Sequence, residues 1–287
     1  MLQRIAAIFL SLLLLSPTLL AGPGASTPLQ QAFRHLQPSK LTGWAYDRTT
    51  LLNRVTYVEH FDPAAPVGKR WTLASINHLP PTPIQVKTYT AGKNPVTGKP
   101  LPKADDGRVR GVVTGTPGNL KHILMKSCVP NTGLQLVSGT TDTLTYHYKP
   151  DCRSLFAHLK QKLATDKSLR KNPDKMQQMQ TAAKRVQEIY AHLEGTLTIS
   201  KVGPYIRSIR LVNSRPFSLM YVVSIKTYHA ELDFKRLPSD GPTVLVRNAI
   251  TFRGRVFIFK NLDENADISF SGFARATSMR AEPWRVR

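Results

Sequence analysis

The stretch SCVPNTGLQLVSGTTDTLTYHYKPDC, Ser127–Cys152, contains both cysteines of the 287-residue chain, near its two ends. Residues 133–137 (GLQLV) and 143–148 (TLTYHY) alternate apolar and polar side chains, as half-buried strands do. The intervening SGTTDT holds Gly139 and Asp142, which favour a turn. The stretch therefore predicts a β-hairpin, and with it an antiparallel sheet.

The spacing of the two cysteines fits the same hairpin. Paired residues of an antiparallel hairpin have a constant index sum, and the midpoint between Cys128 and Cys152 is Thr140, inside the turn. Cysteines that face each other in this way can reach the Cα separation of about 5.5–6 Å that a disulfide prefers. We predict a Cys128–Cys152 disulfide; the alternative is a catalytic thiol, for which His122 would be the nearby partner.

The chain opens with MLQRIAAIFLSLLLLSPTLLAGPGA, in the order of a secretory signal peptide: a cation, an apolar run and then small residues. The apolar run is shorter than the roughly 20 residues that span a bilayer as a helix, and an uncleaved anchor is the alternative. We expect residues 1–21 to be a signal peptide, cleaved after Ala21 or as late as Ala25. The remaining chain would then be periplasmic or secreted, where thiols oxidise.

Between the hairpin and residue 194 the sequence changes to a helical period. Apolar residues recur three or four positions apart from 152 to 166, where Asp151 would be the N-cap, and from Asn172 to about Leu193, with Gly195 as the expected helix stop. From Gly195 onward, strands and short turns alternate as an antiparallel meander. We predict a single β-rich α+β domain over 26–287, with a curved antiparallel sheet. We expect two mid-chain amphipathic helices as an insertion at 152–194, and a mobile Pro/Gly/Lys loop at 90–107.

The segment LEGTLTISKVGPYIRSIRLVNSRPFS, Leu193–Ser218, opens one strand with a glycine and the next with a Pro-aromatic step. With helices packed into a curved meander, the C-terminal third of the chain resembles the periplasmic lipoprotein-carrier superfamily. The resemblance implies an open half-barrel that binds a lipid or a lipoprotein. The arginine-centred lid motif of that family is absent from the sequence, so no site residue is carried over. The chain is also similar to exported proteins of Gram-negative bacteria.

The charge balance of the chain is strongly positive. Its 40 Lys and Arg against 18 Asp and Glu give a formal net charge of +22, which attracts polyanions. For an exported chain the expected partners are lipids or anionic envelope polymers, the membrane surface among them, and not nucleic acid. A solvated basic surface that only maintains solubility is the alternative.

Motifs for catalysis and for cofactors are missing from the sequence. Its eight histidines form no H-x-H or H-x₃-H pair, and neither a G-x-S-x-G elbow nor a P-loop occurs. We therefore expect no catalytic residue, no metal and no cofactor. One alternative is an envelope hydrolase with an unrecognised active site that uses scattered acids, His147 or His229. The other is a structural partner in an envelope assembly.

The predicted binding surface lies on the two helices of the insertion. Their apolar faces would line or cap a hydrophobic ligand, with core packing as the alternative, and the cations of their other faces would contact anionic groups. The leading hypothesis is an exported, non-enzymatic protein that binds an amphipathic or anionic envelope component, such as a lipid, a lipoprotein or a lipopolysaccharide-like molecule. The apolar set is Phe156, Leu159, Met176, Met179, Val186 and Tyr190; the anion-binding set is Lys160, Lys162, Lys171, Lys175, Lys184 and Arg185.

Overall fold

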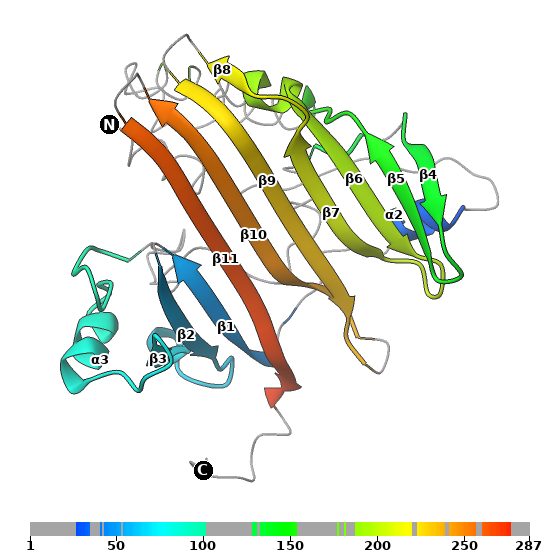
Figure 1. Cartoon of the computed structure of the whole chain (residues 1–287). Helices are drawn as coiled ribbons and strands as arrows, with labels where there is room; N and C mark the ends of the chain where they lie inside the picture. Colours follow the sequence, from blue (N-terminus) through cyan, green and yellow to red (C-terminus); the bar gives the residue numbers. More distant parts are fainter. Residues whose placement is uncertain are drawn as a thin grey trace. The chain divides into compact units, whose positions relative to one another are not determined.

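The structure of the protein is a computed structural model, shown in Figure 1. It describes residues 27–34, 41–101 except 42 and 53, 128–153 except 131 and 132, 177, 181, 187–238 except 220–222, 241–256 and 260–276. The strands within these ranges are β1 (Trp44–Leu52), β2 (Val55–Phe61), β3 (Trp71–Ile76), β4 (Gln135–Gly139), β5 (Thr143–Tyr148), β6 (Leu193–Ser200), β7 (Ile206–Asn213), β8 (Phe217–Leu219), β9 (Val223–Arg236), β10 (Thr243–Val256) and β11 (Lys260–Arg275). The helices are α2 (Pro28–Arg34), the 3-10 helix η1 (Val67–Lys69) and α3 (Pro83–Thr90).

The strands follow one another as a meander. Hydrogen-bonded neighbours have the order β3-β2-β1-β11-β10-β9-β7-β6-β5-β4, and β8 pairs with β9. Most neighbours in this order are also consecutive in the sequence. The exceptions are β1, which pairs antiparallel with β11, and β7, which pairs antiparallel with β9. The predicted β-rich antiparallel sheet is therefore confirmed. Of the two predicted mid-chain helices, the structure describes residues 153, 177, 181 and 187–191, all helical, and the other positions lie outside the described residues.

The chain divides into two compact units. The first, which we call the β4–β9 unit, is drawn from Met1–Pro38, Asn119–Phe234 and Ile250–Glu264. The second, which we call the β1–β3 unit, is drawn from Ser39–Gly118, Lys235–Ala249 and Asn265–Arg287.

The predicted hairpin is confirmed as β4 and β5, with a shifted register. β4 continues to Gly139 because Thr140 closes the turn: its N–H donates to the Thr143 carbonyl at 2.9 Å, and its hydroxyl accepts the N–H groups of Asp142 and Thr143. Leu136 pairs with Tyr146, and the register shifts before Ser138. The ladder is therefore centred beyond Thr140, on the C-terminal side of the expected midpoint.

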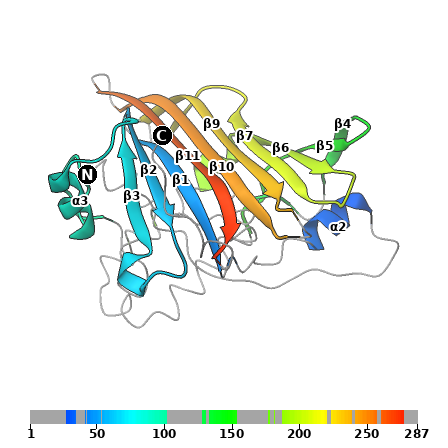
Figure 2. The same cartoon turned by 90° about the horizontal axis from the view of Figure 1, so that it is seen from below.

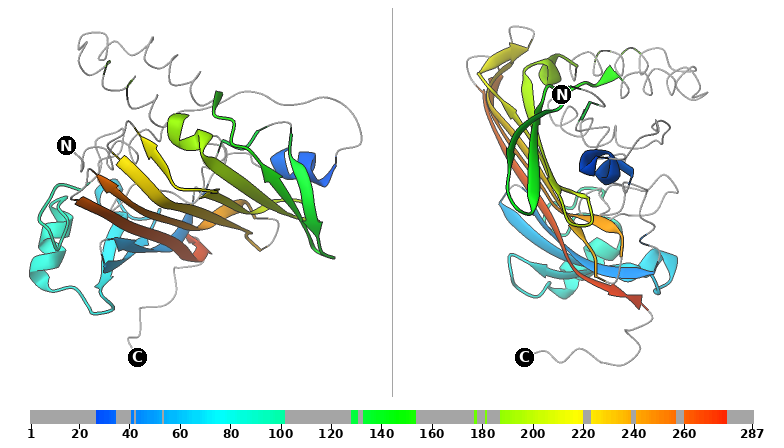
Figure 3. Two further views of the ribbon diagram at one scale, coloured as in Figure 1. Left: turned by 45° about the horizontal axis from the view of Figure 1, so that its top comes forward. Right: turned by 90° about the vertical axis from the view of Figure 1, so that its right-hand side faces the viewer.

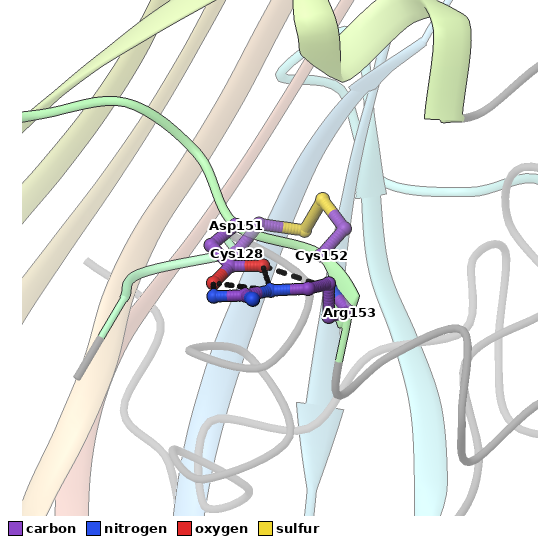
Figure 4. Close-up of a disulfide and its surroundings, with 4 residues drawn as sticks. All are labelled: Cys128, Asp151, Cys152 and Arg153. Carbon is purple, nitrogen blue, oxygen red and sulfur yellow. Dashed lines mark hydrogen bonds and ion pairs between the residues drawn. A yellow bond between two sulfur atoms is a disulfide. The ribbon is translucent and has the colours of Figure 1, made fainter. Parts of the chain in front are cut away.

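The predicted Cys128–Cys152 disulfide is present beyond the ends of this ladder, with the two Cα atoms 4.7 Å apart (Figure 4). The Asp151 N–H donates to the Cys128 carbonyl at 2.8 Å. The Asp151 carboxylate accepts a hydrogen bond from the backbone N–H of Arg153 at 3.1 Å, as the side chain of an N-cap residue does. It also accepts hydrogen bonds from the guanidinium of Arg153. These hydrogen bonds hold the pKa of Asp151 below its ordinary value.

The expectation of a helix stop at Gly195 is wrong. The described helical residues end at 191, and Gly195 lies inside β6. The reason for glycine is steric, since a Cβ atom at Gly195 would lie 2.1 Å from Cζ of Tyr148. Glycine is required here because the ring of a neighbouring strand crosses directly over the backbone.

Part of the loop predicted at 90–107 falls within the described residues. α3 ends at Thr90, and residues 91–101 form hydrogen-bonded turns, in which the Asn94 N–H donates to the Lys99 carbonyl at 2.7 Å and the Leu101 N–H donates to the Gly92 carbonyl at 2.8 Å. Residues 102–107 lie outside the described residues.

Candidate functional site

One face of the sheet formed by β5, β6, β7 and β9 is apolar and buried. Along one row of this sheet, Gly195 pairs with Tyr148 and with Leu211, and Leu211 pairs with Ala230. Several side chains of this row and of the neighbouring rows that point to the same face are almost fully buried. We call this set the apolar face: Tyr148, Leu193, Leu197, Ile199, Ile209, Leu211 and Ala230.

The alternation of β6 explains how this face forms. In LEGTLTIS the residues Leu193, Leu197 and Ile199 point to the apolar face, while Glu194, Thr196 and Thr198 point to the other side of the sheet. Burial of each large aliphatic side chain contributes about 1.5–3 kcal/mol. A one-residue slip of β6 would move all three to the polar side, so the register is strongly determined.

Three tyrosines gather at the apolar face. Tyr148 belongs to β5, Tyr190 belongs to the helical residues 187–191 just before β6, and Tyr228 lies in β9 two residues before Ala230, hence on the same side of the strand. The pKa of Tyr190 is raised well above its ordinary value, first by burial and then by the neighbouring Tyr228 and Tyr148. Tyr190 therefore lies close enough to each of the other two tyrosines to interact with it electrostatically.

Burial keeps these hydroxyl groups neutral. It raises the pKa of Tyr148, and it raises the pKa of Tyr228 to about 12. At physiological pH such phenols do not act as bases, because their proton is bound. They can donate and accept hydrogen bonds within an apolar surrounding, which suits the polar group of an amphipathic molecule.

Short elements pack on this part of the sheet. α2 contacts β6 and buries Ala32, and Figures 2 and 3 show α2 against the sheet. Ile189 is buried, and the ring of His192 stacks on Phe217 of β8 with ring centroids 4.4 Å apart. Tyr190 thus lies among packed neighbours.

The opposite face of the same strands is polar. Lys149 Nζ lies 3.0 Å from Oε1 of Glu194, and His147 Nε2 lies 3.6 Å from Oε2 of the same carboxylate. The hydrogen bond from Lys149 is the main reason why the pKa of Glu194 lies below its ordinary value. His147 is therefore beyond direct hydrogen-bond distance of Glu194, and its ring is partly exposed on the sheet surface. His229 lies in β9 opposite Val212.

The structure describes one of the predicted ligand-binding residues, Tyr190, and it lies at the apolar face. The remaining predicted residues lie outside the described residues; they are Phe156, Leu159, Met176, Met179 and Val186 of the apolar set and Lys160, Lys162, Lys171, Lys175, Lys184 and Arg185 of the anion-binding set.

The β1–β3 unit contains a buried charged cluster that the sequence analysis missed. Arg48 donates from Nε and Nη2 to Oε2 of Glu59 at 3.0 and 2.7 Å, and neither side chain is exposed. The Tyr89 hydroxyl of α3 donates to Oε1 of Glu59 at 2.7 Å, and the Arg48 guanidinium lies 4.1 Å from the centroid of the Trp71 ring. Burying two ions costs several kcal/mol each, so they require hydrogen-bonded partners of this kind.

The positions of Arg48 and Glu59 in the sequence could have indicated this ion pair. Arg48 and Glu59 face each other in the β1–β2 ladder, and both occupy inward positions of their strands. Inward positions beside them hold aromatic residues, and Tyr46 stacks on Phe61 with ring centroids 5.0 Å apart. A cation and an acid at facing inward positions of one hairpin indicate a buried ion pair.

On the other side of β1, a histidine and a carboxylate form a second pair. Asp47 Oδ1 lies 2.7 Å from Nδ1 of His60, and both side chains are partly exposed. Ser271 of β11 faces Asp47 from the opposite side. The order across the sheet is therefore serine, aspartate, histidine, with His60 and Ser271 two strands, or about 10 Å, apart. A serine-hydrolase triad needs histidine between the other two groups, so this row cannot supply one.

No protein-family model, no curated protein and no solved structure matches the chain. Within the described ranges, no helix has both the length and the apolar character required to cross a membrane. The same residues contain no group of three or more His, Cys, Asp or Glu side chains arranged to hold a metal ion.

Proposed function

We propose that this protein is an exported, non-enzymatic binding protein whose ligand is an amphipathic, anionic component of the cell envelope: a lipid, a lipoprotein or a lipopolysaccharide-like molecule. The observation that carries the proposal is the apolar face of β5, β6, β7 and β9, with Tyr148 and Tyr228 on its strands and Tyr190 directly before β6. Sites for hydrophobic ligands are mainly apolar, with a few polar groups that fix the orientation of the ligand. Neutral tyrosine hydroxyls are polar groups of that kind.

Two further features support the proposal. The Cys128–Cys152 disulfide is compatible with an oxidising compartment, as expected after export by a signal peptide at residues 1–21. The net charge of +22 favours an anionic ligand over a neutral one. On this proposal the cations at 160–185 contact the charged group of the ligand, and the sheet acts as the open half-barrel of a lipid carrier.

The test is native mass spectrometry of the protein purified from its own host, followed by solvent extraction and identification of any bound lipid. We expect a bound amphipathic molecule in the wild type and a lower occupancy in Tyr190→Ala. The matched control is Tyr205→Ala, because Tyr205 is half-buried in the β6–β7 turn of the same unit and its backbone carbonyl, which the substitution retains, accepts the Ser200 N–H. Circular dichroism verifies that both variants are folded.

A wild-type protein that carries no ligand would overturn the proposal. So would equal occupancies in the two tyrosine variants. A bound molecule without an acyl chain or other large apolar part would contradict the assignment of the ligand class.

A further inference from the structure

The surface formed by α3 and its flanking turns exposes several large apolar side chains. The exposed fractions are 68% for Leu79, 78% for Ile84, 42% for Val86 and 48% for Val96. Single exposed apolar residues are ordinary, but here four of them fall within one short segment. We call this the 79–96 surface. Helices that pack on a protein core turn their apolar residues inward, whereas α3 turns Tyr89 inward and leaves Ile84 outside.

The same segment carries cations and no acid. The sequence has no Asp or Glu between Asp62 and Asp105, and Lys87, Lys93 and Lys99 are exposed there. In the part of the chain that the structure describes, none of these three lysines forms an ion pair. Other exposed cations do have carboxylate partners, namely Arg153 with Asp151, Arg210 with Glu231 and Arg247 with Asp267.

The 79–96 surface is held firmly in the β1–β3 unit. Thr82 and Gln85 form a capping box at the start of α3. The Tyr89 hydroxyl binds the buried Glu59, and the Asn94 side chain lies 3.4 Å from the Tyr57 hydroxyl of β2. Figures 1 and 2 show α3 beside β3. The exposed side chains are therefore presented by a preformed structure, so that docking needs little ordering.

We propose that the 79–96 surface docks on an anionic lipid bilayer, with Ile84 entering the head-group region, and that Lys87, one turn further along the same helix face, Lys93 and the adjacent Lys99 contact lipid phosphates. Lysine is depleted at protein–protein interfaces. At a bilayer surface its aliphatic part lies along apolar groups while its ammonium reaches the phosphates. An acid-free, lysine-bearing apolar surface therefore fits a bilayer better than a protein partner.

The inference deepens the proposed function by naming the membrane as a partner of the protein. It rests on residues of the β1–β3 unit, whereas the ligand site rests on the apolar face of the β4–β9 unit. Each can therefore fail alone: Ile84→Asp should leave the lipid occupancy in native mass spectrometry unchanged, and Tyr190→Ala should leave binding to vesicles unchanged.

The experiment is co-sedimentation of the purified protein with vesicles of phosphatidylcholine mixed with phosphatidylglycerol, compared with vesicles of phosphatidylcholine alone. We expect binding to the anionic vesicles only. Ile84→Asp should weaken it roughly tenfold or more, because a buried aliphatic group is replaced by a charge of the same sign as the lipid. Lys87→Glu should weaken it by at least roughly fivefold. The matched control is Leu136→Asp on β4, because Leu136 is also exposed, to 59%, and the sequence has no Lys or Arg between Lys126 and Lys149.

A second measurement reports insertion directly. The fluorescence that Ile84→Trp adds to that of the three native tryptophans should shift to the blue on anionic vesicles and be quenched by brominated lipid, while the fluorescence that Leu136→Trp adds should not change. The inference is overturned if the wild type does not bind the anionic vesicles, if Ile84→Asp binds as tightly as Leu136→Asp, or if Ile84→Trp is not quenched.

Discussion

The contact between Gly195 and Tyr148 makes a sharp prediction for the substitution Gly195→Ala. A Cβ atom at this position would lie 2.1, 2.4 and 2.5 Å from Cζ, Cε2 and Cε1 of the Tyr148 ring. Carbon atoms in contact lie about 3.5–4.0 Å apart, so the ring or the strand must move by more than about 1 Å. The side chains of Tyr148, Leu193 and Leu197 are almost completely buried, which leaves little space for that movement.

The expected cost follows from two opposing terms. Overpacking a tight core costs about 1–3 kcal/mol, and this site belongs at the upper end because the overlap is with the rigid part of a ring. Alanine also lowers the conformational entropy of the unfolded chain, which stabilises the folded protein by about 0.4–1 kcal/mol. We expect Gly195→Ala to lower the free energy of unfolding by about 2 kcal/mol, which corresponds to a fall in Tm of roughly 4–8 °C.

The assay is urea unfolding followed by circular dichroism, with two comparisons. Gly68→Ala is the matched control, since a Cβ at Gly68 meets nothing within 4 Å and should leave the unfolding midpoint unchanged or slightly raised. In a Tyr148→Leu background, which removes the overlapping ring atoms, Gly195→Ala should cost less than about 0.5 kcal/mol. The reasoning is refuted if Gly195→Ala unfolds at the wild-type urea concentration, or if its cost is the same with leucine at position 148.

Two further predictions concern the disulfide and the buried tyrosines. Replacing Cys128 and Cys152 by serine should lower the free energy of unfolding by about 3 kcal/mol, because the disulfide closes a loop with a sequence separation of 24. A reductant should destabilise the wild type in urea but not the double variant. Equal responses of the two proteins to the reductant would count against the disulfide. Stability should also fall as the pH rises above about 10, because unfolded tyrosines release their protons there while burial raises the pKa of Tyr228 to about 12 in the folded protein. The unfolded state then binds fewer protons than the folded state, so each such tyrosine lowers the free energy of unfolding by up to about 1.4 kcal/mol per pH unit. Between about pH 10 and 12, the urea midpoint should decline less steeply with pH in Tyr228→Phe than in the wild type. The same decline with pH in both proteins would contradict this prediction.

Local patterns in the sequence were sufficient for much of the fold. The hairpin, the disulfide and the antiparallel succession of strands after residue 195 follow from turn residues and cysteine spacing. These features depend on residues close together in the chain, where periodicity is informative.

Features that depend on contacts between distant strands were not predicted. The glycine at 195 has the local appearance of a helix end, and only the ring of Tyr148 explains its place in a strand. One local feature was also missed: β4 continues to Gly139 because the Thr140 hydroxyl accepts two N–H groups of the turn, which an argument from strand length alone does not consider. For the candidate site, the sequence singled out Tyr190 on its helical period, but Tyr148 and Tyr228 join it only through the β5–β6–β7–β9 pairing.

The pairing of β1 with β11 has a consequence for the kinetics of folding. Trp44 pairs with Arg275 and Leu52 with Ala266, so β1 cannot form these pairs until β11, more than two hundred residues later in the chain, has been synthesised. Such high contact order slows folding, and until β11 arrives, β1 presents an unpaired edge to other molecules. Deleting β11 would leave that edge permanently open, and the shortened chain should aggregate through β1 even though every residue of β1, β2 and β3 is intact.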